Sequence, residues 1–209
     1  MGVLTMSMLI RIQRCCLLLG LCMAISACAS TSPPTRYYVL TPADEAVLSD
    51  RDREDPAGPL VSLGPVVIPS YLDRPQIISR GTRHRLQLKS FEHWAEPIQE
   101  NISRVLIQNL AGEVPSARVI AFPDRNFGQA DYRVLVSIER FEPIAAAGEV
   151  ILPARWSLFN DRERILCDRS AAFSHPFPDG DLDGILAAMS RALADCSSAM
   201  AECLRGALD

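Results

Sequence analysis

Residues 131–173 alternate between apolar and polar side chains, and this alternation limits the possible fold more than any other part of the sequence. In the first segment, the alternating apolar positions are Tyr132, Val134, Val136 and Ile138. Side chains two residues apart lie on the same face of a strand, so the pattern predicts a half-buried strand. A second alternating segment over 150–158 contains Pro153, which indicates an edge or a bulge. After a polar turn at 160–163, residues 164–173 are expected to form a third strand that runs back along the second. The three strands would form an antiparallel meander.

Two segments have the apolar spacing of amphipathic helices. After Ile98, apolar residues follow at positions four, seven, eight and twelve further on, which places them on one helix face. Pro97 suits the first helical position, and Gly112 suits the cap after the last turn. Between residues 182 and 207, apolar residues recur at alternating steps of four and three. This indicates a long helix whose stripe packs across a sheet, or else a coiled-coil seam.

Shorter strands are predicted around these elements. They lie at residues 36–40, 60–68, 76–80, 84–88 and 117–122. Gly64-Pro65 indicates a bulge or an edge in the second of these strands, and Gly81-Thr82 suits the turn of a hairpin. The charged segment 44–59 is typical of a solvated loop. At 209 residues, the predicted fold class is α+β: a single domain in which a mainly antiparallel sheet packs against two amphipathic helices.

The first 28 residues have the pattern of a bacterial lipoprotein leader. Arg11 and Arg14 precede an uncharged, mostly apolar run over residues 15–25. This run is shorter than the ~20 residues of a membrane-spanning helix and fits the apolar core of a signal peptide. It ends in Ile25-Ser26-Ala27-Cys28, which matches the lipobox: an aliphatic residue, two small residues and a cysteine. An ordinary cleaved signal with a chance cysteine is the alternative.

From the lipobox we predict three segments: a lipoprotein signal peptide over residues 1–27, a lipidated tether over 28–35 and a folded domain over 36–209. Cys28 would carry covalent diacylglycerol and an N-acyl chain, and several acyl chains anchor a protein stably. Ala29, and not Asp, follows the cysteine, which favours the periplasmic face of the outer membrane. The net charge of −4 gives no basic footprint for nucleic acid.

A loop bracketed by prolines, residues 69–75, joins two predicted strands. Each proline removes a backbone donor and fixes φ, so the loop is expected to be stiff and to display its central side chains. In one interpretation its tyrosine and leucine cap the core. In the other the loop binds a protein partner, because rigid loops on a sheet often carry function. The candidate partner-binding residues are Tyr71, Leu72, Asp73, Arg74 and Trp94.

The chain carries no recognisable enzyme motif. GxSxG, HExxH, GxGxxG and the phosphate-binding P-loop are all missing from the sequence. The three histidines, His84, His93 and His175, lie far apart in sequence. There is no CxxC and no Cys/His ligand spacing. We therefore expect no catalytic residues, no metal, no cofactor beyond the acyl chains, and a domain that folds without metal or reductant.

Three cysteines remain after the predicted cleavage and acylation: Cys167, Cys196 and Cys203. Disulfides persist in the oxidising periplasm, and an odd number leaves at least one thiol unpaired within the chain. Cys196 and Cys203 are two helical turns apart, a rise of about 10.5 Å, whereas bridged Cα atoms lie within about 7 Å. Cys167 can therefore pair with either of them, or all three can be buried free thiols.

Taken together, these residues resemble the PqiC-like family of ABC-type transport auxiliary lipoproteins. The most specific matches are Tyr-Leu-Asp-Arg-Pro-Gln at 71–76 and Trp-Ala-Glu-Pro at 94–97. Further matches are the lipobox, 37–40, 67–78, Asn109-Leu110, Phe141-Glu142, 154–156 and 188–190. Many members have Arg where this chain has His93. The resemblance implies a non-enzymatic partner, tethered to the outer membrane, of a transporter with mammalian-cell-entry (MCE) domains that moves lipid between the two Gram-negative membranes and supports envelope integrity.

Two other functions stay open from the sequence. One is an outer-membrane lipoprotein that binds and activates a periplasmic envelope enzyme, such as a peptidoglycan synthase. The other is a lipid carrier with its own apolar pocket. The seven residues between Cys28 and the first strand reach at most about 25 Å. The domain would therefore stay near its membrane, and an MCE-domain partner would have to come to it. A homo-oligomer is also compatible with the sequence.

Overall fold

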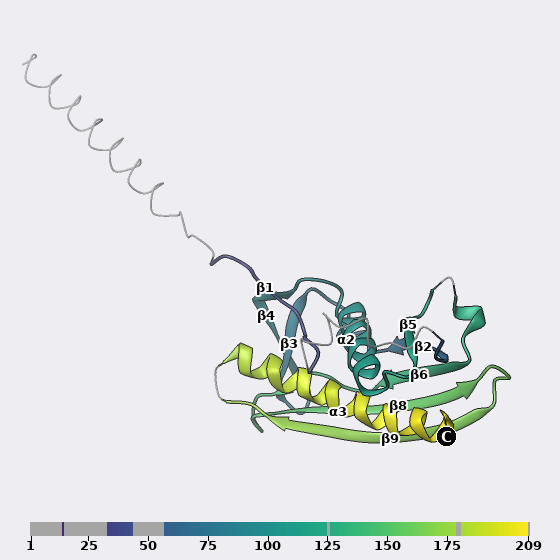
Figure 1. The fold of residues 1–209 in the computed structure, drawn as a ribbon. Helices are drawn as coiled ribbons and strands as arrows, with labels where there is room; N and C mark the ends of the chain where they lie inside the picture. Colours follow the sequence, from purple (N-terminus) through teal and green to yellow (C-terminus); the bar gives the residue numbers. More distant parts are fainter. Residues whose placement is uncertain (1–13, 15–32, 44–56, 125, 179–180, 209) are drawn as a thin grey trace, which may run out of the picture. The chain divides into compact units, whose positions relative to one another are not determined.

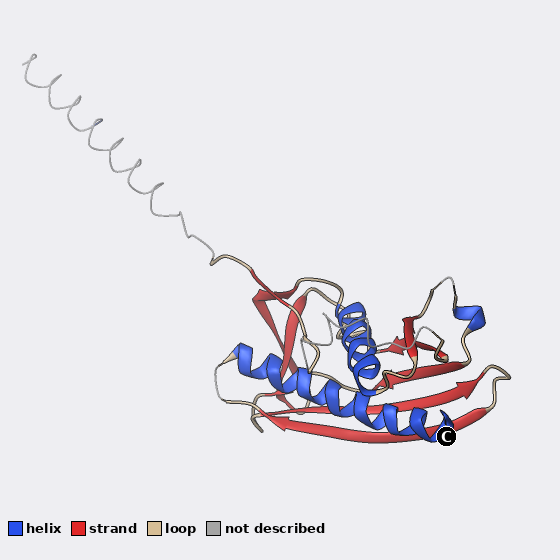
Figure 2. Cartoon of the chain, in the orientation of Figure 1, coloured by secondary structure: helices blue, strands red, loops and turns tan. Residues whose placement is uncertain are grey.

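The computed structural model describes residue 14 and residues 33–43, 57–124, 126–178 and 181–208. From Thr35 onward the chain forms one compact unit of strands and helices (Figures 1 and 2). The elements in order are β1 (Arg36–Tyr38), β2 (Leu60–Val67), β3 (Gln76–Thr82), β4 (Arg85–Trp94), α2 (Ile98–Glu113), β5 (Arg118–Ala121), η3 (Phe127–Gln129), β6 (Tyr132–Ile138), β7 (Pro143–Ile144), β8 (Glu149–Asn160), β9 (Ile165–Pro176) and α3 (Leu182–Leu208).

The described strands form one mixed sheet in the order β1-β4-β3-β7-β8-β6-β2-β5, with β9 added to β8. The predicted α+β class is confirmed. The meander is also confirmed, because β6, β8 and β9 pair antiparallel. The sheet is not wholly antiparallel, since β1 pairs with β4, and β2 with β5 and β6, in parallel. Parallel partners need long crossovers, and the chain between β2 and β5 contains the β3–β4 hairpin and α2.

The predicted bulge in the second strand is present at Gly64-Pro65. The register of β2 against β6 shifts between Leu63 and Val66. Gly64 has a φ of +119°, a backbone conformation that residues other than glycine rarely adopt. A Cβ at this position would lie 3.1 Å from the Phe122 Cβ. The predicted hairpin of these two strands is also present, but its turn lies at Arg83-His84, because β3 continues through Gly81-Thr82 and Thr82 pairs with Arg85. The strand β4 continues to Trp94, further than expected.

The two helices cover the same face of the sheet (Figure 2). The predicted stripe of α3 is buried against β8, β9 and α2, at Leu186, Met189, Leu193, Cys196, Met200 and Cys203. A narrow apolar stripe is enough to seat a helix on a sheet, because burial contributes about 25 cal/mol per Å² of apolar surface. The stripe therefore packs across the sheet of its own unit, as the simpler of the two interpretations predicted.

Both ends of α2 differ from the predicted ones. Pro97 is the N-cap residue and Ile98 is the first helical residue. Gly112 lies inside the helix, and Val114 is the C-cap, with its N–H donating to Leu110 O. The helix extends past the glycine because α3 binds its last residue: Arg205 Nη1 donates to Glu113 O at 3.0 Å. The carbonyl at the helix end thus gains a partner without a glycine cap.

A buried side-chain amide and a buried hydroxyl, one from each helix, bind the segment after β1. Asn101 of α2 accepts from Leu40 N at 2.7 Å through Oδ1 and donates to Leu40 O at 3.2 Å through Nδ2. Ser190 of α3 accepts from Thr41 N through its Oγ at 3.3 Å. These bonds pair backbone groups that would otherwise be buried without partners. The start of the folded unit is therefore fixed to its core.

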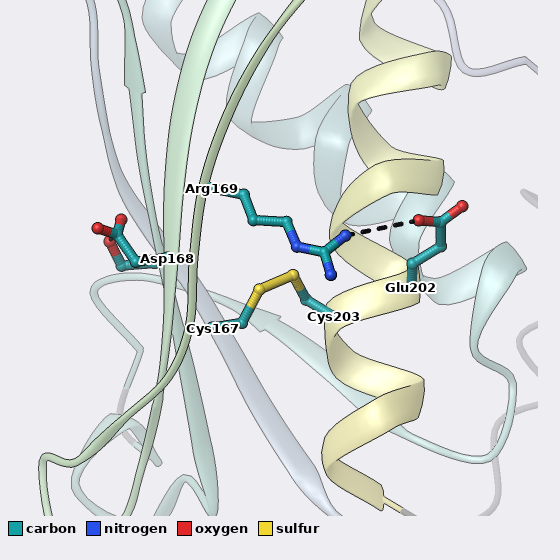
Figure 3. Close-up of a disulfide and its surroundings, with 6 residues drawn as sticks. Cys167, Asp168, Arg169, Glu202 and Cys203 are labelled. Carbon is teal, nitrogen blue, oxygen red and sulfur yellow. Dashed lines mark hydrogen bonds and ion pairs between the residues drawn. A yellow bond between two sulfur atoms is a disulfide. The ribbon is translucent and has the colours of Figure 1, made fainter.

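A disulfide joins β9 to α3 (Figure 3). It links Cys167 to Cys203, with the Cα atoms 6.0 Å apart. The Arg169–Glu202 ion pair, at 3.9 Å, joins the same two elements beside it. Cys196 is buried as a free thiol, and burial raises its pKa to about 12. Of the pairings that the sequence left open, the structure therefore contains Cys167 with Cys203.

We expect the double change Cys167→Ser, Cys203→Ser to lower the free energy of unfolding by about 3–4 kcal/mol. The bridge closes a loop with a sequence separation of 36, and constraining a loop of that length in the unfolded chain contributes about 4 kcal/mol. We expect the variant still to fold, because the other stripe residues of α3, from Leu186 to Met200, stay unchanged. Urea unfolding at neutral pH measures the effect, with the unbridged Cys196→Ala as the control. Equal midpoints for the wild type and the double variant would contradict this prediction.

Candidate functional site

The proline-bracketed loop, residues 69–75, folds into tight turns between β2 and β3. Leu72 N donates to Pro69 O at 2.9 Å, and Arg74 N donates to Leu72 O at 2.8 Å. The Arg74 guanidinium also donates through Nε to Tyr71 O at 2.8 Å. These local bonds and the two fixed proline φ angles give the loop one defined shape.

A buried carboxylate lies beneath this loop. Glu142, the residue that precedes β7, is 1% exposed. Tyr71 donates its hydroxyl hydrogen to Glu142 Oε2 at 2.8 Å. Arg80 of β3 donates through Nε to Glu142 Oε1 at 2.6 Å, and its Nη2 lies 2.5 Å from the same oxygen. A buried carboxylate is costly unless it is paired and hydrogen-bonded, and here both oxygens have partners.

The Tyr71–Glu142–Arg80 cluster fixes the loop through a neutral phenol. Burial and, next, the Glu142 carboxylate raise the pKa of Tyr71 to about 12. The phenol therefore keeps its proton at neutral pH and acts as a donor. Burial lowers the pKa of Arg80, but its bond to Glu142 outweighs burial, so that the pKa is raised overall. The cluster is therefore a structural clamp that holds the loop through hydrogen bonds to both carboxylate oxygens of Glu142.

Only part of the candidate partner-binding set lies at the surface. Asp73 and Arg74 are exposed, and Tyr71 is half-buried. Leu72 is 6% exposed and Trp94 is 8% exposed, so the expectation that the loop displays its leucine is wrong. Both side chains belong to the hydrophobic core and are not available at the surface to contact a partner. For the tyrosine and leucine, the interpretation as core caps describes the observed burial.

No sequence motif links Glu142 to Arg80, because more than sixty residues separate them. One signal is present in the sequence: Glu142 lies an even number of positions after the inward-facing Val134, Val136 and Ile138 of β6. Trp94 ends β4 and donates its backbone N–H to Pro75 O at 2.7 Å. It therefore fixes the far end of the loop through its backbone, while its side chain packs inward.

A groove of about 870 Å³ lies beside the loop, between α2 and the ends of β2 and β5. Its lining includes Val66, Asp73, Glu100, Arg104, Ile107 and Phe122. Arg104 pairs with Glu96 at 2.5 Å. The lining includes both charged and apolar side chains, and such a combination occurs at protein–protein interfaces. The exposed loop residue Asp73 is continuous with this groove.

The described part of the chain contains neither a cluster of metal ligands nor a helix that could span a membrane. Within the ranges from 33 to 208 given above, no group of three or more His, Cys, Asp or Glu side chains could hold a metal ion. None of the helices described is both long and apolar enough to cross a membrane. His175 Nε2 lies 2.8 Å from Asp195 Oδ2, and His93 contacts the edge of Tyr37. The predicted anchor Cys28 and its lipobox lie outside the described residues.

The fold and the fixed loop define a class of small α+β domain built on a mixed sheet. Residues 38–201 match the family model described as the ABC-type transport auxiliary lipoprotein component. This match spans most of the sequence, so the chain belongs to that family. No curated protein matches it at a significant level.

Two solved structures share the fold. One is described as a crystal structure of an uncharacterized protein, with 17% identity, a TM-score of 0.66, and coverage of 81% of this chain and 98% of the other. The other is protein XCC0632 from Xanthomonas campestris, of the DUF330 family, with 18% identity, a TM-score of 0.63, and coverage of 83% and 98%. At these identities the likeness shows the fold alone.

Proposed function

We propose that this chain is a periplasmic lipoprotein anchored to the outer membrane through Cys28. In this role it acts as a non-enzymatic auxiliary component of an MCE-type intermembrane lipid transport system and contributes to envelope integrity. Its partner is the MCE-domain protein that reaches the periplasm from the inner membrane. The chain itself carries out no reaction, and its task is to receive that partner at the membrane.

The observation that carries the proposal is the family match over residues 38–201. It is supported by the lipobox that ends at Cys28, before the matched residues. The first gives a transport auxiliary lipoprotein, and the second gives the means of attachment. The described site is compatible, since its buried carboxylate is fully occupied by Tyr71 and Arg80. A clamp of this kind shapes a binding loop but leaves no free acid or base for catalysis.

We further propose that the exposed part of the loop, Asp73 and Arg74, binds the partner together with the adjoining groove. Arginine is enriched among the residues that dominate interface energies. The clamp to Glu142 pre-organises the loop, so little conformational entropy would be lost on binding. The buried Leu72 and Trp94 contribute by fixing the loop's shape, and Tyr71 contributes through its exposed edge.

Deleting the gene tests the transport function against the main alternative. We expect cells without this chain to admit more of a dye that an intact outer membrane excludes, and the full-length chain to restore exclusion. The composition of the peptidoglycan, measured on muropeptides from the same cells, should stay unchanged. Normal dye exclusion together with altered peptidoglycan cross-linking would contradict the proposal and favour a lipoprotein that activates a peptidoglycan synthase.

A further inference from the structure

The first strand presents an exposed aromatic side chain where the folded unit begins. Tyr37 is 66% exposed and Val39 is 43% exposed, whereas Tyr38 and Leu40 turn inward. Phe91 of the neighbouring strand β4 is 38% exposed. It lies two residues before His93, which is the register partner of Tyr37. We name Tyr37, Val39 and Phe91 the β1/β4 patch.

The backbone that carries this patch is held in place. The Tyr37 ring meets the His93 ring edge-on, with centroids 6.0 Å apart. Ala95 N donates to Tyr38 O at 2.9 Å, and Leu40 is bonded at both backbone groups to Asn101. An exposed apolar patch on a rigid backbone needs little ordering to bind a surface. A group of neighbouring exposed apolar side chains of this kind, unlike a single one, is typical of an interaction site.

The charges around the patch are compatible with a lipid surface. Arg36 and Lys89 flank it, and the Arg36 side chain is 66% exposed. The nearest carboxylate, Glu92, is paired with Arg36 and its own side chain is only 14% exposed. Asp183 also acts on the Arg36 charge. In a chain whose net charge is −4, the two bases and two acids named here balance, so this end has no excess of negative charge that would repel anionic lipid headgroups.

The length of chain before the patch limits where it can go. Tyr37 is nine positions after Cys28, and these nine steps span at most about 32 Å when fully extended. A short linker of this kind gives its attached surface an effective concentration in the millimolar range. Even weak affinity for the bilayer would then keep the patch bound. Tyrosine suits this position because its ring is apolar and its hydroxyl can stay in contact with water.

We propose that the β1/β4 patch rests on the phospholipid surface of the membrane that holds Cys28, so that this end of the sheet faces the lipid. The inference rests on the proposed lipid anchor. It adds a second contact, made by the protein itself, which restricts the orientation of the domain on a short tether.

Photo-crosslinking of the full-length chain in cells tests this contact. A benzophenone amino acid replaces Tyr37 in one variant, Phe91 in a second and Ile165 in a third. Ile165 is 61% exposed and begins β9, which starts at the end of the unit far from β1 (Figure 1). It is therefore a matched apolar control. Resistance to a protease before irradiation checks that each variant is folded.

After irradiation, the intact mass of each purified variant is measured. We expect the mass of one added phospholipid at positions 37 and 91, with a yield severalfold above that at position 165. A yield at position 37 no higher than at 165, or adducts of protein only, would overturn the inference. The same spectra show whether Cys28 is acylated. An acylated chain without lipid adducts refutes this contact alone, whereas an unacylated chain refutes the anchor and the contact with it.

Discussion

Cys28→Ala is expected to release the protein from the membrane fraction into the soluble periplasm. The substitution removes the only thiol that the lipobox, Ile25-Ser26-Ala27-Cys28, offers for acylation. Each buried CH₂ of an acyl chain contributes about 0.8 kcal/mol, and two or more chains make binding stable. The exposed apolar patch around Tyr37 is too small to replace them. Fractionation of envelopes, followed by the mass of the N-terminal peptide, measures the change.

The wild-type chain should fractionate with the outer membrane and carry acyl mass on Cys28. Ala29→Asp is an informative second variant, because an aspartate after the acylated cysteine is the usual inner-membrane retention signal of enterobacteria. It should keep the acyl mass and, in such a host, shift the protein toward the inner-membrane fraction. Wild-type protein without acyl mass would contradict the anchor.

Glu142→Ala is expected to lower the free energy of unfolding by about 3 kcal/mol. Removing one partner of a buried ion pair costs about 3–5 kcal/mol. The lower end applies because the Arg80 side chain is 20% exposed and can regain some hydration. The Tyr71 hydroxyl would also lose the acceptor that it contacts at 2.8 Å. Chemical unfolding measures the loss. Protease cleavage within 69–75 should also be faster than in the wild type, and slower cleavage would contradict the prediction.

Two further variants separate the clamp from a general effect of charge. Glu142→Gln keeps the shape and an acceptor for Tyr71, so it should lose less stability than Glu142→Ala. Glu139 is exposed, and Glu139→Ala removes an acid three positions before Glu142, so this variant should stay within about 0.5 kcal/mol of the wild type. If Glu142→Ala were as stable as Glu139→Ala, the buried cluster would not hold the loop.

Local patterns predicted most elements of the fold. The alternation over 131–173 and the stripe of the last helix each depend on one face being buried, and such a face is recorded in the spacing of apolar residues. The parallel pairings of β1 with β4 and of β2 with β6 leave no local record, because they join segments far apart in sequence. The same holds for the displaced C-terminal end of α2, which depends on Arg205 of α3.

The loop shows where the sequence stops being informative about the site. Its two prolines predicted a stiff connection, and the structure has tight turns there. Which side chains turn inward depends on tertiary contacts, such as that of Tyr71 with Glu142, an acid that no motif links to it. Leu72 was therefore expected at the surface and is buried. The cysteine pairing was open for a similar reason, since either Cys196 or Cys203 fitted the spacing until the packing of α3 on β9 was known.

The clamp also determines which variant can test the partner-binding surface. Tyr71→Ala would remove the donor to Glu142 as well as any contact with a partner, and so would confuse stability with binding. Asp73 and Arg74 are exposed, and the double change Asp73→Ala, Arg74→Ala removes one exposed side-chain hydrogen bond, from Arg74 Nε to Tyr71 O, so it should lower the melting temperature only slightly. At a binding hot spot, truncating such an arginine costs about 2 kcal/mol or more, which is roughly a thirtyfold loss of affinity.

Capture of the tagged full-length chain from solubilised envelopes, with identification of the bound proteins by mass spectrometry, tests the transport role most directly. We expect an MCE-domain protein to be captured by the wild type, and its yield to fall strongly with Asp73→Ala, Arg74→Ala at an only slightly lower melting temperature. Capture of a peptidoglycan synthase with no MCE-domain protein would contradict the proposed function.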